Sequence, residues 1–125
     1  PAVAKASMFL TAGSLADMVW TGSATRHIRA SLEGEIELAE LRGAWAPLSL
    51  ESYADKLARH GLELQMVLAE RDQVVLPALS ERLVSELDRS GARSRVNRMN
   101  CGHYSLTLLP YIIGAGLTAA RFLNR

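Results

Sequence analysis

The stretch from residue 62 to residue 99 constrains the fold most strongly, because its pattern indicates a strand, a helix and a second strand. Residues 62–69 (LELQMVLA) alternate apolar side chains and then become apolar on both faces, which is typical of a strand covered on both sides. Pro77 suits the first position of the helix that follows. The leucines of that helix share one stripe: Leu79, Leu83 and Leu87. Residues 95–99 indicate a second, more polar strand, so we expect a parallel sheet with covering helices.

The rest of the chain continues this alternation at both ends. Residues 5–12 form a short apolar run that predicts a first, buried strand, and the helical stretch 14–59 separates it from the strand at 62–69. A last helix is expected to begin at Pro110 and to carry its apolar residues on one side: Ile113, Leu117 and Ala120. The element order predicts a single α/β domain in three layers, a mostly parallel sheet of about three strands with helices on both faces.

Composition narrows the possible partners and the compartment. The chain has 125 residues, of which 49% are apolar, and this is enough for one core. The balance of 14 Lys and Arg against 13 Asp and Glu gives no reason to expect a nucleic-acid partner. The longest uncharged apolar stretch, residues 106–120, is too short for a membrane span and contains Pro110. A single cysteine, Cys101, excludes an internal disulfide and favours a cytoplasmic location.

Two polar residues lie where open α/β sheets keep their sites. Asp72 follows the strand at 62–69, and His103 follows the strand at 95–99. Because the carboxyl ends of parallel strands meet at one edge of a sheet, these two side chains are expected to meet. An Asp beside a His orients the imidazole and stabilises it when it takes a proton. Judged by spacing alone, the alternative to such a pair is that Asp72 is a surface residue in a turn and His103 a loop residue with no shared role.

The sequences of the two loops resemble those of the α/β-hydrolase superfamily. Residues 69–75 (AERDQVV), followed by Pro77 and a helix, are similar to the superfamily's acid loop, and residues 100–105 (NCGHYS) are similar to its histidine loop. The resemblance covers nearly the whole chain. The chain would correspond to the later portion of the superfamily's fold, from the sixth strand to the final helix. It implies that Asp72 is the acid and His103 the general base of a catalytic triad. The implied activity is hydrolysis of a carboxylic ester or related acyl bond, as in an esterase.

The resemblance also implies a serine nucleophile on a Gly-x-Ser-x-Gly turn, a pattern that this sequence lacks. The simplest expectation is that the first five strands and the nucleophile lie upstream of Pro1, so that the chain is a carboxyl-terminal fragment. Ser14 is a rival nucleophile, because residues 12–16 (AGSLA) place small residues two positions before and after it. Ser14 as an ordinary helix cap is the alternative interpretation.

The same resemblance gives the helical stretch 14–59 a role as a modest lid over an acyl pocket. Trp20 and Trp45 would then be candidate pocket walls. The three histidines, His27, His60 and His103, do not have the spacing of metal ligands, and we expect neither a metal nor a cofactor. Cys101 is interpreted as structural rather than reactive.

A second hypothesis belongs to another functional class, a non-catalytic chain that associates with itself. In a sheet of few strands, residues 5–12 would form an open apolar edge, and such an edge invites pairing with another chain. The expected partner is then a second copy in a homodimer, or the missing amino-terminal half. Under the hydrolase hypothesis, the partner is a small-molecule ester or acyl substrate.

Overall fold

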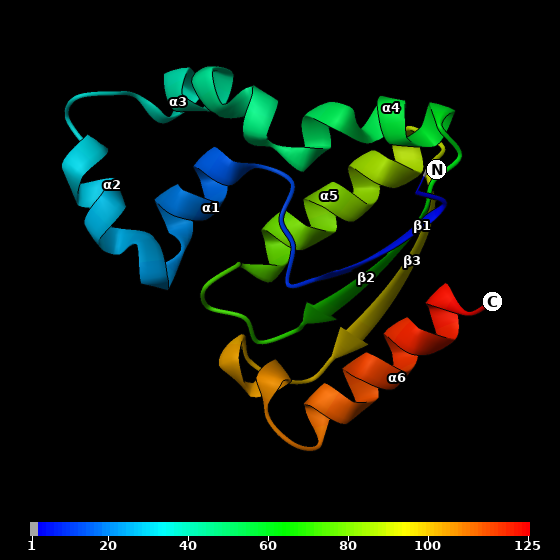
Figure 1. The fold of residues 1–125 in the computed structure, drawn as a ribbon. Coiled ribbons are helices and arrows are strands. Elements are labelled where there is room, and N and C mark those ends of the chain that lie inside the picture. Colours follow the sequence, from blue (N-terminus) through cyan, green and yellow to red (C-terminus); the bar gives the residue numbers. More distant parts are fainter. Residues whose placement is uncertain (1–2) are drawn as a thin grey trace.

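The computed structural model describes residues 3–125. Pro1, beyond which the sequence analysis placed the nucleophile, lies outside the described residues. Three parallel strands form one sheet, in which the central β2 (Glu63–Ala69) pairs with β1 (Lys5–Phe9) and with β3 (Arg93–Met99). Helices cover both faces of this sheet (Figure 1). The predicted three-layer α/β fold is therefore confirmed.

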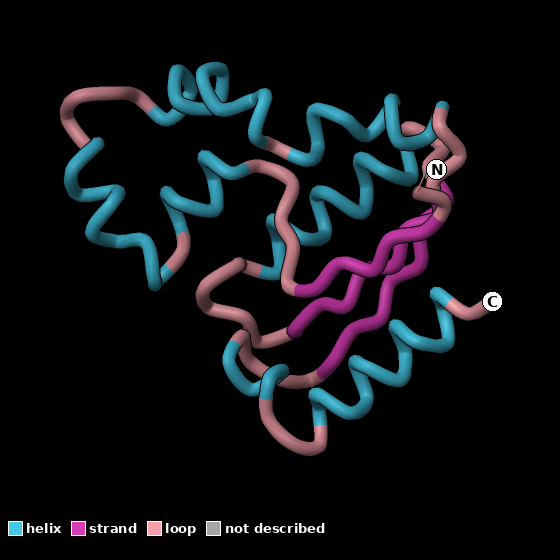
Figure 2. The backbone as a smooth tube through the Cα atoms, in the orientation of Figure 1, coloured by secondary structure: helices cyan, strands magenta, loops and turns pink. Residues whose placement is uncertain are grey.

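The helices divide into three groups around the sheet. Their bounds are α1 (Leu15–Thr21), α2 (Arg26–Leu32), α3 (Leu38–Trp45), α4 (Ala54–Arg59), α5 (Pro77–Arg89) and α6 (Tyr111–Leu123). Short 3-10 turns join them: η1 (Ser23–Thr25), η2 (Ala46–Leu48), η3 (Leu50–Tyr53) and η4 (Tyr104–Thr107). Figure 2 shows α4 and α5 on one side of the strands and α6 on the other, with α1, α2 and α3 as a separate group. None of the helices in residues 3–125 has the length and hydrophobicity that a membrane crossing requires.

The main core lies between the sheet and α5. Alternate residues of β2 point to this face, and the core is built from Leu64, Met66 and Leu68 of β2 with Leu83 and Leu87 of α5. These side chains are almost completely buried. Burial of a leucine side chain contributes roughly 2 kcal/mol, so this contact anchors α5 to the strands. Two leucines of the expected stripe, Leu83 and Leu87, form the packed face, whereas Leu79 is half-buried and lies outside this cluster.

The core on the opposite face is smaller, and it corrects the prediction for α6. The residues of α6 that are buried are Ala115, Ala119 and Phe122. Ile113 and Leu117, which the sequence placed on the packed side, are 55% and 51% exposed, and Ala120, placed there too, is also exposed. The first turns of α6 are apolar all round, so hydrophobicity does not select a face, and small alanines allow the closest approach to the sheet.

The first strand is also shorter than its apolar run. β1 ends at Phe9 rather than at residue 12, because Leu10 takes a left-handed conformation with φ of 52°. β1 is an edge strand of the sheet formed by residues 3–125; residues 5–8 are half-buried and Phe9 is exposed, rather than buried as predicted. β3 begins two residues earlier than predicted, at Arg93 instead of Arg95.

Candidate active site

The loop after β2 holds the Asp72 carboxylate at the carboxyl edge of the sheet. Its Oδ1 atom accepts hydrogen bonds from the backbone N–H groups of Val74 and Val75, both at 2.8 Å. The residue is only 5% exposed. Two backbone donors on one oxygen fix the orientation of the carboxylate and leave Oδ2 for a second partner.

The loop after β3 is tied directly to the loop that carries Asp72. The backbone N–H of Glu70 donates to the carbonyl of Met99 at 2.9 Å, and that of Arg71 donates to the carbonyl of Cys101 at 3.0 Å. The Arg71 guanidinium donates to the carbonyl of Asn100 at 2.8 Å. The two loops are therefore held in register, as a continuation of the β2–β3 pairing.

These two loops bring His103 against Asp72. The Nδ1 atom of His103 lies 2.8 Å from Oδ2 of Asp72, and the imidazole is 23% exposed. An ionised carboxylate only accepts hydrogen bonds, so in the neutral ring Nδ1 carries the proton and Nε2 has a free lone pair. The meeting of the two side chains that the sequence predicts is present, and the arrangement is suited to accepting a proton at Nε2.

A hollow of about 290 Å³ lies beside His103. Its lining residues come from both loops, from η1 and from η4: Ser23, Arg71, Gln73, Val74, Gly102, His103, Tyr104 and Ser105. The Ser23 N–H donates to the Gln73 carbonyl at 3.1 Å, which joins η1 to the acid loop. Gly22 allows this approach, because a Cβ there would lie 2.6 Å from the Val74 carbonyl oxygen. The tryptophans named as candidate walls, Trp20 and Trp45, are half-buried and do not line this hollow.

Ser14 occupies a different part of the molecule. Its Oγ accepts a hydrogen bond from the Asp17 N–H at 3.2 Å, so it is the N-cap of α1. Its backbone is extended, with φ of −100° and ψ of 117°, whereas a nucleophile elbow requires a strained turn. Ser14 lines a separate hollow with Asp17 and Arg82, and no hydrogen bond within residues 3–125 joins it to His103. This geometry fits the helix-cap interpretation.

An ionic cluster around the buried Asp17 carboxylate, with two partly exposed arginines, is not signalled by the sequence. The Asp17 carboxylate is 3% exposed and accepts hydrogen bonds from Arg42 at 2.6 Å and from Arg82 at 2.7 Å. Arg82 also donates to Glu51 at 3.1 Å. Burial alone raises the pKa of Asp17, but the two guanidinium groups outweigh it and hold that pKa well below its usual range. The cluster links α1, α3 and η3 to α5.

The remaining reactive side chains near the site are inert or isolated. Cys101 is 1% exposed, and burial raises the pKa of its thiol, which keeps it protonated at neutral pH. Among residues 3–125, no three His, Cys, Asp or Glu side chains gather closely enough to hold a metal ion. The site therefore offers the Asp72–His103 pair and neighbouring hydroxyl and amide groups for chemistry.

Comparisons with known proteins identify the fold by structure and not by sequence. No protein-family profile matches the chain, and no curated protein matches it in sequence. The chain is similar in structure to Pyrococcus horikoshii acylaminoacyl peptidase, with a TM-score of 0.70 and 10% sequence identity. The match covers 97% of this chain and 19% of that chain, so these residues span about a fifth of the peptidase. The match shows the fold, a parallel α/β sheet with helices on both faces that is shared with this part of the peptidase.

Proposed function

We propose that Asp72 and His103 are the acid and the general base of a serine hydrolase that cleaves a carboxylic ester or related acyl bond. The observation that carries the proposal is the 2.8 Å hydrogen bond between the buried carboxylate and a partly exposed imidazole, next to a hollow. Nε2 of His103 takes the proton of the serine hydroxyl while the serine Oγ attacks the acyl carbon. The imidazolium then gives this proton to the leaving group, and a water molecule releases the acyl product by the same steps.

In this mechanism Asp72 acts through His103. Its carboxylate holds the imidazole in the tautomer with a free Nε2 and offsets the positive charge that forms on the ring. The backbone donors of Val74 and Val75 keep the carboxylate in place while the charge on the ring changes. The buried position of Asp72 strengthens this interaction, because little water competes for the carboxylate.

We place the nucleophile in polypeptide outside residues 1–125, seated beside the open edge of β1. Two observations support this placement. Ser14 is a buried helix cap in another hollow, and β1 has a strand on one side only in the sheet formed by the described residues. Phe9, at the end of this edge, is 42% exposed and is available to pack against such a neighbour. The helical stretch 14–59 would act as a lid through η1, where Ser23 already borders the hollow.

The experiment that tests this function is labelling with a fluorophosphonate, which reacts with activated serines. The 125-residue chain alone, and the same chain in the assembly isolated from its natural source, are treated and the label is located by peptide mass. We expect no label on Ser14, and a label on a serine of the accompanying polypeptide that is lost in His103→Ala. His60→Ala is the matched control, because His60 is an exposed histidine at the end of α4.

Each other outcome changes the account in a defined way. A label on Ser14 that His103→Ala removes would place the nucleophile within the chain and overturn the placement beside β1. No label in either preparation would contradict the hydrolase function. The open edge of β1 would then favour the alternative role, self-association through strand pairing, which sedimentation detects as a concentration-dependent dimer.

A further inference from the structure

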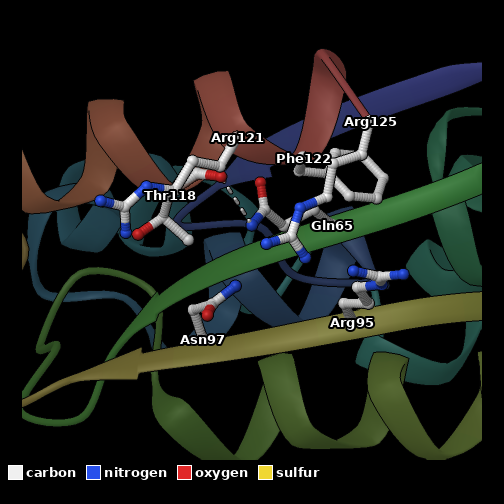
Figure 3. A pocket seen from close by; sticks show the side chains of 7 residues that line it. All are labelled: Gln65, Arg95, Asn97, Thr118, Arg121, Phe122 and Arg125. Atoms are coloured by element: carbon white, nitrogen blue, oxygen red, sulfur yellow. Dashed lines mark hydrogen bonds between the residues drawn. The ribbon is translucent and has the colours of Figure 1, made fainter.

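A third hollow, of about 280 Å³, lies between α6 and the sheet, away from the residues that line the hollow beside His103. Figure 3 shows its lining side chains, which come from β2, β3, the last turns of α6 and, for Arg125, the residues that follow α6. They are Gln65, Arg95, Asn97, Thr118, Arg121, Phe122 and Arg125. Three of the seven are arginines and none is acidic. The chain as a whole carries a net charge of only +1, so this hollow concentrates positive charge.

The three arginines of this hollow have no acidic partner among residues 3–125, a property they share with four arginines elsewhere: Arg26, Arg59, Arg71 and Arg93. Within residues 3–125, ion pairs with carboxylates are formed by five other arginines: Arg29, Arg42, Arg82, Arg89 and Arg98. No such pair involves Arg95, Arg121 or Arg125. Three guanidinium groups around one hollow repel one another, and a bound anion would convert that repulsion into attraction.

The floor of the hollow is built from fixed polar groups. Gln65 is 3% exposed; its Oε1 accepts from the Ser7 hydroxyl at 3.0 Å and its Nε2 donates to the Thr118 carbonyl at 3.3 Å. The Arg95 guanidinium lies over the Phe122 ring, 5.9 Å from its centre, which limits the positions it takes. Asn97, on the same face of β3, points into the hollow (Figure 3).

Protection of the sheet edge does not account for these charges. Edge strands often carry charged residues that prevent pairing with other chains, and β3 is an edge strand. Arg98 of β3 points to the opposite face and is neutralised by Glu81, with both hydrogen bonds at 2.7 Å. Arg95 is an exposed residue on the face toward α6; it has no carboxylate partner within residues 3–125 and lines the hollow together with the neutral amide of Asn97. This arrangement fits recognition of an anion.

We propose that this hollow binds a small molecule that carries a phosphate group. Arg95 and Arg125 would hold the phosphate oxygens with paired N–H donors, Asn97 would donate to a third oxygen, and Arg121 lies at the other end of the hollow. The size of the hollow suits a small ligand. Nucleic acid does not fit as well, because Glu63 lines the adjoining hollow beside Arg93 and interrupts the positive surface.

The test is a titration of the 125-residue chain with inorganic phosphate and, separately, with phenyl phosphate, followed by the amide and side-chain signals in NMR. We expect saturable shifts that centre on Asn97 and Gln65. Arg95→Gln should weaken binding about tenfold, which is the loss of one charge-assisted interaction. Arg98→Gln is the matched control, because it removes the same charge from the other face of β3, and it should change the affinity less than twofold.

The two phosphates distinguish the source of the ligand. Tighter binding of phenyl phosphate supports an organic phosphate ester, and equal binding supports free phosphate. Absence of saturable binding at millimolar phosphate, or equal weakening by both substitutions, would overturn the proposal. Tighter binding of a glutamate-rich peptide than of either phosphate would also overturn it. These results do not depend on His103, so they stand or fall separately from the hydrolase proposal.

Discussion

Replacement of His103 with alanine is expected to lower kcat for ester hydrolysis by about 10⁶-fold, and Asp72→Asn by about 10⁴-fold. His103 is the group that accepts and returns the proton, so its loss stops both halves of the reaction. Asn at position 72 can donate as well as accept, and it no longer selects the tautomer in which Nε2 is free. The measurement is steady-state hydrolysis of a chromogenic ester by the assembly that labels with fluorophosphonate.

Comparison of kcat with KM distinguishes a loss of catalysis from a loss of folded protein. We expect both substitutions to act on kcat with little change in KM, because neither side chain is proposed to bind the ground-state substrate. His60→Ala, on the exposed end of α4, should keep turnover within about twofold of wild type, as expected for a surface substitution with no role in the reaction. Turnover within tenfold of wild type in a folded His103→Ala protein would remove His103 from the mechanism.

The second large effect concerns stability and Asp17. Asp17→Asn is expected to lower the free energy of unfolding by about 2 kcal/mol, because a buried carboxylate loses its charge-assisted bonds to Arg42 and Arg82. The measurement is urea unfolding at neutral pH. Glu81→Gln is the control, since the Glu81–Arg98 pair is nearly half exposed and should contribute less than about 1 kcal/mol.

The same cluster leads to a prediction of how the free energy of unfolding depends on pH in the acidic range. The pKa of Asp17 is lower in the folded protein than in the unfolded chain, where it is about 3.9. Its contribution is therefore complete above about pH 5 and is lost as the pH falls below the unfolded value toward the lowered folded one. Wild-type stability should fall more steeply than that of Asp17→Asn in this acidic range. Equal slopes for the two proteins would show that Asp17 is not the group that titrates.

The parts of the fold that follow from local pattern are predictable from the sequence. The stretch 62–69 alternates and then becomes apolar on both faces, and the helix begins at Pro77, so the strand and the helix follow from the sequence; their strand–helix–strand order predicts the parallel pairing. The meeting of Asp72 and His103 is predictable for a related reason. Each follows a strand, and pairing of β2 with β3 brings the two strand ends to one edge.

The parts that depend on tertiary packing are not predictable in this way. The packed face of α6 is set by Ala115 and Ala119, whose small side chains allow contact with the sheet, although Ile113 and Leu117 are more hydrophobic. The partners of Asp17 are 25 and 65 residues away along the chain, and no local spacing relates them. The arginines around the hollow between α6 and the sheet are likewise brought together only when α6 packs across the strands.

The most direct test is to determine the tautomer of His103 by ¹⁵N NMR of the imidazole, at a pH high enough for the ring to be neutral. We expect a proton on Nδ1 and none on Nε2, because Nδ1 lies 2.8 Å from Oδ2 of Asp72. We also expect that Asp72→Asn removes this preference, while the tautomers of His27 and His60 stay unchanged. A wild-type ring protonated on Nε2, or an equal mixture of both forms, would contradict the claim that Asp72 prepares His103 to act as a base.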